Sequence, residues 1–288
     1  MSRNLIARLC VAAVAIPIIL WICYQGGWWL FGMVSLFALI AIAEFLWAEG
    51  YRPNSVYFWV TLLLIASIWW SLANLCETVG KIDRLSFFWP VDMIPLYVGY
   101  FLITGALLAI GRESPAELIR KHARLSWGAF YVGLLYVFVF LLGYREGPSM
   151  QVSGGDRLLF LFGLLWVGDT AAMWVGKAFG KHKLAPTVSP NKTVEGFFGG
   201  ILGALAVGVL MIFWKFSAVP WYHVLIIAAG CSIFGQLGDL VESMWKRSLG
   251  IKDSSAIIPG HGGILDRFDS LLFAAPFMFA YLLLFAGL

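Results

Sequence analysis

Two aspartates lie inside long apolar segments of the sequence. Asp169 precedes Lys177 by eight residues, and Asp239 precedes Lys246 by seven. At about 1.5 Å rise per residue, both carboxylates would lie roughly 10–12 Å below the ends of their helices. A charge at that depth is costly, so we expect each carboxylate to face a protein-lined cavity or a partner. The alternative is a carboxylate that stabilises helix packing through a neighbouring lysine or arginine.

Asp239 begins a polar stripe along one helical face. Glu242, Ser243 and Lys246 follow it at positions i+3, i+4 and i+7. Two acids, a hydroxyl and an ammonium on one face suit a divalent cation and a phosphate better than they suit lipid.

Three glycines surround a histidine in the next polar loop, and two aspartates three residues apart follow them. Glycine lets backbone amides approach an anion closely, and the histidine could bond a phosphate. The aspartates lie where a helix N-terminus favours negative charge, so ordinary capping is their alternative role. These residues are Gly260, His261, Gly262, Gly263, Asp266 and Asp269.

The loop over 180–196 is a second candidate anion site. Ser189, Lys192 and Thr193 offer hydroxyl and ammonium donors, and Pro190 stiffens the backbone. The alternative is a positively charged connector. Oxygen ligands favour Mg²⁺ bridged to substrate phosphates. The sequence has no HExxH motif, Cys–His cluster or serine nucleophile elbow. Phosphoryl or nucleotidyl transfer to a lipid is therefore the predicted chemistry.

These residues must be positioned by membrane-spanning helices. Only 12% of the residues are charged and 61% are hydrophobic, against about 25% charged in soluble domains. This excludes a soluble globular enzyme, a disordered chain and a secreted disulfide scaffold. We predict an all-α polytopic membrane protein with about nine transmembrane helices. The apolar segments are Leu5–Tyr24, Trp28–Trp47, Ser55–Cys76, Pro95–Ile110, Trp127–Gly143, Leu158–Phe179, Gly196–Trp214, Tyr222–Trp245 and Phe268–Leu288.

The lysines and arginines predict the orientation. Nine spans place 15 of the 20 on the side of the amino end and the even-numbered loops. The positive-inside rule then puts the amino end in the cytoplasm and the carboxyl end outside. We divide the chain into an amino-terminal transmembrane region, 1–126, and a catalytic transmembrane region, 127–288. The cytoplasmic loops of the catalytic region are 180–196 and 246–267.

A capping box begins after the fourth segment, with Ser114 as N-cap, Pro115 at N1 and Glu117 at N3. We expect a short amphipathic helix on the membrane surface, with a solvated linker as the alternative. Its basic residues are Arg120, Lys121 and Arg124.

The carboxyl-terminal half resembles a known family. Residues Ser243–Asp269 read SMWKRSLGIKDSSAIIPGHGGILDRFD, without departure from the signature of phosphatidate cytidylyltransferases, also called CDP-diacylglycerol synthases. Ser189–Gly196, SPNKTVEG, is similar to a second segment of that family, and Asp169 and Asp239 occupy matching places. The resemblance is strong over Leu158–Leu288. The amino-terminal half matches only as apolar spans.

The resemblance implies that CTP and phosphatidate give CDP-diacylglycerol and pyrophosphate with Mg²⁺. It also implies a metal centre on the acids matching Asp239 and Asp266. Whether a second cation, divalent or K⁺, is bound stays open. As auxiliary metal ligands we expect Asp169 and Asp269. The expected phosphate clamp, beside Lys192, is Lys246, Arg247, Lys252 and Arg267. Further expected substrate-binding residues are Ser189, Thr193, Ser243, His261, Gly262 and Gly263.

Several alternatives stay open at this point. A lipid kinase, or a CTP-dependent transferase for a polyprenyl or archaeal lipid, would use the same chemistry. A transporter would also place ionisable residues in its spans, and a scaffold would leave the polar stripe unexplained. We expect membrane lipids and no nucleic acid as partners, and a bacterial cytoplasmic (inner) membrane as the location. A homodimer stays open.

Overall fold

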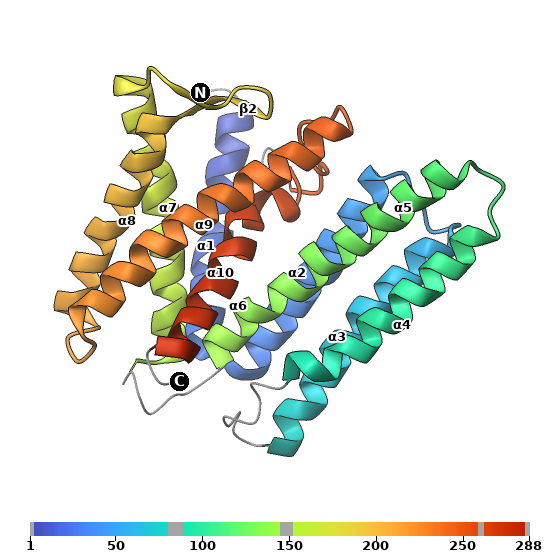
Figure 1. Ribbon diagram of the computed structural model, residues 1–288. Coiled ribbons are helices and arrows are strands. Elements are labelled where there is room, and N and C mark those ends of the chain that lie inside the picture. The colour runs from blue at the N-terminus through green and yellow to red at the C-terminus, as the bar shows by residue number, and fades with distance from the viewer. Residues whose placement is uncertain (1–2, 80–88, 145–151, 259–261, 286–288) are drawn as a thin grey trace. The chain divides into compact units, whose positions relative to one another are not determined.

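The chain is almost entirely helical. The computed structural model describes residues 3–79, 89–144, 152–258 and 262–285. The elements in chain order are α1 (Arg3–Gln25), α2 (Gly27–Ala48), α3 (Val56–Val79), α4 (Trp89–Ala109), α5 (Pro115–Gly128), the π-helical turn η2 (Ala129–Leu134), α6 (Leu135–Tyr144), α7 (Gly154–Phe179), β1 (Lys183–Ala185), β2 (Ser189–Thr193), α8 (Val194–Trp214), α9 (Trp221–Ser248) and α10 (Leu265–Phe285) (Figure 1).

Each predicted apolar segment falls on a helix, which confirms an all-α, multi-pass membrane protein. Within the described ranges, seven helices are long and apolar enough to cross a membrane. Two shorter apolar stretches, Ala13–Gln25 and Met93–Ala109, correspond to the first and fourth predicted segments. Nine crossings and the orientation of the termini therefore stay predictions.

The predicted surface helix is not separate from the fifth span. Ser114 accepts a hydrogen bond from the Glu117 backbone N–H at 3.4 Å, which confirms the capping box. The helix then continues through η2 and α6 as one 30-residue helix, Pro115–Tyr144. Its glycines serve packing rather than helix termination, because a Cβ at Gly128 would lie 2.1 Å from the Phe45 ring. The predicted helix after Ser114 is therefore present and joins the fifth span without a break, and its location on the membrane surface and the start of the span at Trp127 stay predictions.

The basic residues of α5 are paired with acids, which leaves less unbalanced positive charge than the sequence suggested. Exposed pairs contribute little to stability, and of the three acids only Glu49 has a buried side chain, at 3% exposure. The pairs are Arg120–Glu117 at 3.5 Å, Arg124–Glu49 at 3.5 Å, and Lys121–Glu113.

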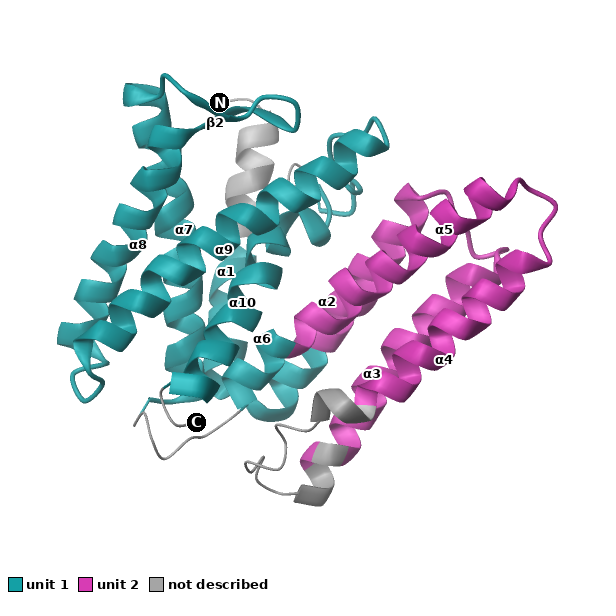
Figure 2. Cartoon of the chain, in the orientation of Figure 1, with its two compact units in different colours: residues 1–33, 138–288 teal, residues 34–137 magenta. Residues whose placement is uncertain are grey.

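The chain forms two compact units (Figure 2). Unit 1 comprises 1–33 and 138–288, and unit 2 comprises 34–137. All the predicted site residues belong to unit 1. In unit 2, two tyrosines of α4 stabilise the region of the π-helical turn. The Tyr97 hydroxyl donates to the Ala129 carbonyl and the Tyr100 hydroxyl to the Leu125 carbonyl, each at 3.2 Å. These bonds satisfy carbonyls near an irregular turn, where the helical pattern changes.

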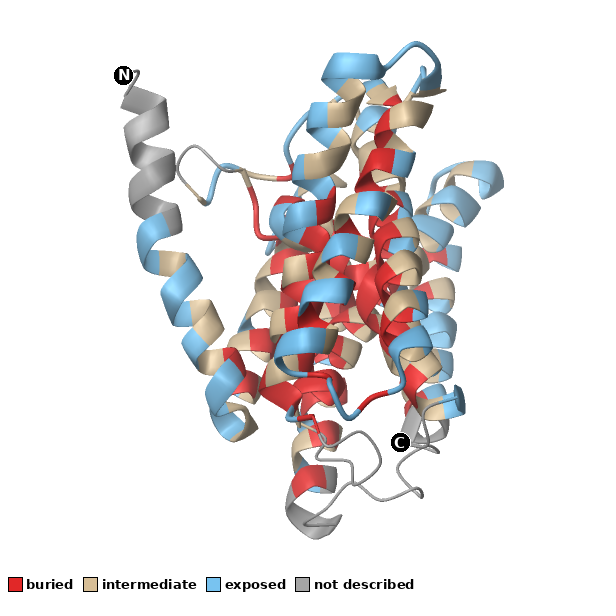
Figure 3. Ribbon diagram, turned by 90° about the vertical axis from the view of Figure 1, so that its left-hand side faces the viewer, coloured by how far each residue is buried: buried red, intermediate tan, exposed pale blue. Residues whose placement is uncertain are grey.

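Helices α7 and α8 pack closely because small residues line their contact. A Cβ added at Gly199 would lie 2.6 Å from the Val175 Cβ, and one at Gly203 would lie 2.6 Å from the Ala171 Cβ. Large apolar residues of α8, such as Phe213, are exposed, as expected for a lipid-facing surface. Figure 3 shows that single helices carry both buried and exposed residues. The contact sets the distance between the two helices that carry the β-hairpin.

The predicted loop 180–196 folds as a β-hairpin at one end of α7 and α8 (Figure 1). Strands β1 and β2 are antiparallel, and Lys183 pairs with Thr193. The Glu195 carboxylate closes the base of the hairpin. It accepts hydrogen bonds from the Lys181 and His182 backbone N–H groups and contacts the His182 ring at 2.7 Å. The hairpin is therefore tied to the first turn of α8.

The α7–α8 contact yields a stability prediction. Gly199→Ala should destabilise the protein by about 1–3 kcal/mol, because the new methyl group overpacks the helix contact. Gly163→Ala is the matched control on α7, since its Cβ would meet only Val207, at 3.4 Å. Thermal unfolding in one detergent measures both, and equal melting temperatures would show that α7 and α8 do not depend on this close approach.

Candidate active site

Two cavities in unit 1 share Asp169 and Asp239 in their walls. One cavity, of about 410 Å³, lies among α7, α9, α10 and the loop before α10. We call it the acidic cavity. The other, of about 650 Å³, lies among α7, α8, α9 and the hairpin, and we call it the hairpin cavity. The two aspartates predicted from their depth in the helices therefore face cavities, as expected.

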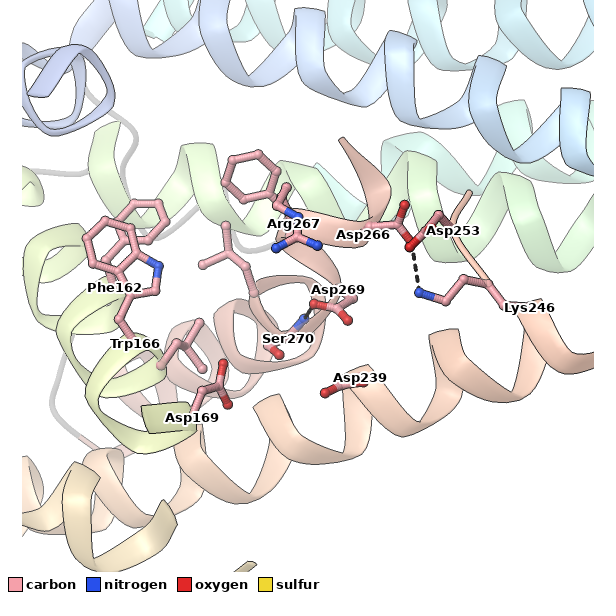
Figure 4. A pocket seen from close by; sticks show the side chains of 13 residues that line it. Phe162, Trp166, Asp169, Asp239, Lys246, Asp253, Asp266, Arg267, Asp269 and Ser270 are labelled. Carbon is pink, nitrogen blue, oxygen red and sulfur yellow. Dashed lines mark hydrogen bonds and ion pairs between the residues drawn. The ribbon is translucent and has the colours of Figure 1, made fainter. Parts of the chain in front are cut away.

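The acidic cavity combines five carboxylates with two cations. Asp169, Asp239 and Asp269 come from three different helices, α7, α9 and α10, and their side chains surround one space (Figure 4). The remaining charged lining residues are Asp253, Asp266, Lys246 and Arg267. A bound cation, a cationic group of a ligand or protonation of a carboxyl group would balance the excess of negative charge.

Asp266 holds the loop before α10 in place. Its Oδ2 accepts hydrogen bonds from the Ser254 backbone N–H at 2.8 Å, the Ser254 hydroxyl at 2.9 Å and the Gly263 backbone N–H at 2.8 Å. Gly262 has φ +84° and leaves no room for a side chain, because a Cβ would lie 2.7 Å from Oδ2. The Gly263 N–H therefore binds the chain's own Asp266, and binding of a substrate anion by this loop stays a prediction.

Lys246 links α9 to α10. Its ammonium lies 2.7 Å from Asp266 Oδ1 and 2.5 Å from the Glu242 carboxylate. The Lys246 side chain is 12% exposed and that of Glu242 only 1%. Burial of both partners makes this ion pair far more consequential than a surface pair. Glu242 belongs to the polar stripe that the sequence indicated, and it lines neither cavity but pairs with Lys246 at i+4.

The hairpin cavity is lined by lysine, amide and hydroxyl groups in addition to the two shared aspartates. Lys192 of β2 lies 2.7 Å from Asp239 Oδ2, and Ser243 donates to Asp239 Oδ1 at 3.2 Å. Thr193 lines the cavity and also caps α8 by accepting from the Gly196 N–H at 3.1 Å. Lys177, Asn191 and Gln236 complete the polar lining. None of these three was among the predicted site residues. Lys177 could have been found from its spacing to Asp169.

The other predicted residues lie outside both cavities. Arg247 donates to the Ile251 carbonyl at 3.0 Å and so closes the end of its own helix. Ser189 and Lys252 are not among the residues that line either cavity. Ser243 and Gly263 line neither cavity, but they donate hydrogen bonds to Asp239 and Asp266, which do. His261 lies outside the described residues.

The donor set fits a hard cation. Carboxylate oxygens of the acidic cavity are the ligands that Mg²⁺ prefers. Among the described residues, no group of three or more His, Cys, Asp or Glu side chains stands close enough together to hold a metal. Both oxygens of Asp266 already have partners, three hydrogen bonds on Oδ2 and the Lys246 ammonium on Oδ1, and Asp239 is paired with Lys192. Asp266 and Asp239 would therefore hold a cation by exchanging these lysine contacts for it, beside Asp169 and Asp269.

The Lys246 network yields a second stability prediction. Lys246→Met should destabilise the protein by about 3–5 kcal/mol, because it leaves two carboxylates facing each other without a cation. Arg247→Met, on the exposed side of the same turn, should change stability by less than about 1 kcal/mol. Thermal unfolding in detergent compares the two variants. Recovery in Lys246→Met/Glu242→Gln would support the assignment, and equal melting of both single variants would contradict it.

The comparisons with known proteins identify the family of the chain. The model of the cytidylyltransferase family matches residues 6–285. A phosphatidate cytidylyltransferase of Staphylococcus saprophyticus is 35% identical over 275 residues, covering 94% of this chain and 96% of that protein. The enzyme of the same name from Bacillus subtilis is 43% identical over 162 residues, covering 56% of this chain and 58% of that protein. The chain therefore belongs to the cytidylyltransferase family.

Proposed function

We propose that this protein transfers the cytidylyl group of CTP to phosphatidate, giving CDP-diacylglycerol and pyrophosphate for phospholipid biosynthesis. The observation that carries the proposal is the similarity to phosphatidate cytidylyltransferases along 94% of the chain. A carboxylate-rich cavity beside a lysine-bearing cavity, within apolar helices, suits a reaction between a phosphate donor and a lipid. We place the reaction at the cytoplasmic face of a bacterial inner membrane, following the distribution of lysine and arginine.

Phosphatidate, which receives the cytidylyl group, needs little activation. A phosphatidate oxygen attacks the α-phosphorus of CTP, and the bond from that phosphorus to the oxygen bridging the β-phosphate breaks. A phosphomonoester has a second pKa of about 6, so it is largely ionised at neutral pH without a strong general base. Catalysis then consists mainly of positioning and charge stabilisation. Arg267 and Lys192, which line the two cavities, are the side chains proposed to hold phosphate groups.

Asp239 and Asp266 would hold Mg²⁺, with Asp169 and Asp269 as auxiliary ligands. The cation would neutralise charge on the phosphates and on the leaving pyrophosphate. The protein's own contribution is to fix these oxygens. Lys192 and Ser243 contact Asp239, and Lys246 contacts Asp266 Oδ1. A second cation, divalent or K⁺, belongs to the same proposal.

The reaction is tested directly with purified protein. Phosphatidate, labelled CTP and Mg²⁺ in detergent should give labelled CDP-lipid, and EDTA should abolish the transfer because the clustered carboxylates then lack their cation. Polyprenyl phosphate as the acceptor is the matched control. Labelling of that lipid alone, or no transfer by a protein with a normal melting curve, would overturn the proposal.

The metal ligands are tested by charge removal. Asp239→Asn and Asp266→Asn should each lower kcat on the order of 100-fold or more while the protein stays folded. Glu117→Gln on α5 is the control, since Glu117 lines neither cavity. Asp239→Asn is the cleaner of the two variants, because Asp266 also anchors its loop. Near-normal turnover in Asp239→Asn would remove it from the reaction centre.

A further inference from the structure

Gln236 is a buried amide with one unused group. It lies on α9, one turn from Asp239, and is 8% exposed. Its Nε2 donates to the Phe197 carbonyl at 3.2 Å and to the Ser232 hydroxyl at 3.3 Å. These bonds fix the orientation of the amide, because the Phe197 carbonyl can only accept. Within the described structure, no group donates a hydrogen bond to Oε1, although Gln236 lines the hairpin cavity.

The backbone around Gln236 is built to admit its amide. A Cβ at Gly200 of α8 would lie 2.8 Å from Gln236 Nε2. The amide therefore occupies space that any larger residue at position 200 would fill. The result is a preset acceptor in the wall of a cavity of about 650 Å³. An acceptor in a cavity wall, on a side chain that is otherwise buried, selects a ligand that brings a hydrogen-bond donor.

Lys177 supplies the second feature of this cavity. It lies on α7, two turns beyond Asp169 toward the hairpin, and lines the same cavity. In the part of the chain that the structure describes, no carboxylate forms an ion pair with Lys177, whereas Lys192 and Lys246 each have acidic partners. Lys177 and Lys192 thus place two ammonium groups on the hairpin side of the shared aspartates. They suit a polyphosphate.

The proposed substrates differ in the donors that they carry. Ionised phosphatidate with two acyl chains has no hydrogen-bond donor for Gln236 Oε1. CTP has the exocyclic amine of cytosine. Gln236 precedes Asp239 by one turn of α9, and Lys177 follows Asp169 by two turns of α7, while Lys192 contacts Asp239 itself. Acceptor, aspartates and Lys177 thus follow in the order of base, α-phosphate and terminal phosphates. UTP carries a carbonyl oxygen in place of the amine, and two acceptors facing each other would be unfavourable.

Resting on the function proposed above, we infer that the hairpin cavity is the nucleotide site and that Gln236 Oε1 accepts a hydrogen bond from the cytosine amine. Gln236 is then a specificity-determining residue, and Lys177 and Lys192 contact the β- and γ-phosphates. The phosphatidate headgroup approaches the shared aspartates from the acidic cavity, which Arg267 lines together with Phe162, Trp166 and Leu271.

The base contact is tested by nucleotide preference. Gln236→Met should lower the ratio of kcat/KM for CTP to that for UTP roughly 10- to 100-fold, the value of one buried hydrogen bond, and leave the KM for phosphatidate unchanged. Ser232→Ala is the matched control, because it alters the same network without removing Oε1. An unchanged CTP-to-UTP ratio in a folded Gln236→Met protein would overturn the role of Gln236.

The location of the nucleotide is tested without catalysis. In a background with the four native cysteines replaced, Met173→Cys places a thiol in the wall of the hairpin cavity, and Trp174→Cys, which lines neither cavity, is the control. CTP with Mg²⁺ at ten times its Kd should slow maleimide labelling of Met173→Cys about tenfold, as expected from site occupancy. Labelling of Trp174→Cys should not change.

Two further ligands separate the outcomes. Dioctanoyl phosphatidate should not slow labelling of Met173→Cys, and protection by that lipid instead of CTP would assign the hairpin cavity to the acceptor and overturn the inference. If wild-type protein forms CDP-lipid but CTP gives no protection, the inference fails while the proposed function stands. If wild-type protein forms no CDP-lipid, protection by CTP still supports a nucleotide site. Inorganic phosphate alone should not slow the labelling of Met173→Cys.

Discussion

The arrangement of the site depends on the carboxylate of Asp266 and the groups gathered on it. One oxygen takes three hydrogen bonds from the preceding loop, and the other takes the ammonium of Lys246, which also contacts buried Glu242. This network joins α9, α10 and the loop between them. In apolar surroundings such a network is stabilising only when every member is satisfied, because each unpaired charge is costly. The position of Asp269, one turn further along α10, follows from it.

The second constraint is the close packing of α7 against α8. Gly199 and Gly203 let the helices approach to distances at which a single methyl group would collide. This contact fixes α7, which carries Asp169, against α8 and so sets the distance between the two helix ends that the hairpin joins. The tie from Glu195 to Lys181 and His182 then fixes where Lys192 emerges. A polar site is thus positioned by contacts between small apolar residues.

Much of this could be predicted from the sequence, because hydropathy and charge act locally. The helices appeared as long apolar segments, and Asp169 and Asp239 stood out as acids within them. The continuation of α5 into α6 could not be predicted, because it depends on Phe45 packing against Gly128. The hairpin also escaped prediction, since its base is held by Glu195 rather than by strand propensity. Gln236 gave no signal, because only its neighbours on α8 show which of its amide atoms is left unused.

The two aspartates common to both cavities link events on either side of them. Positive charge that settles among the carboxylates of the acidic cavity lowers the negative potential that an anion meets on the hairpin side, since Asp169 and Asp239 face both spaces. Thermodynamic linkage makes the effect reciprocal, so that an anion held by the lysines strengthens cation binding by the same factor. With a cation in one cavity and an anion in the other, the shared wall would give positive cooperativity by electrostatics alone, with no change of shape.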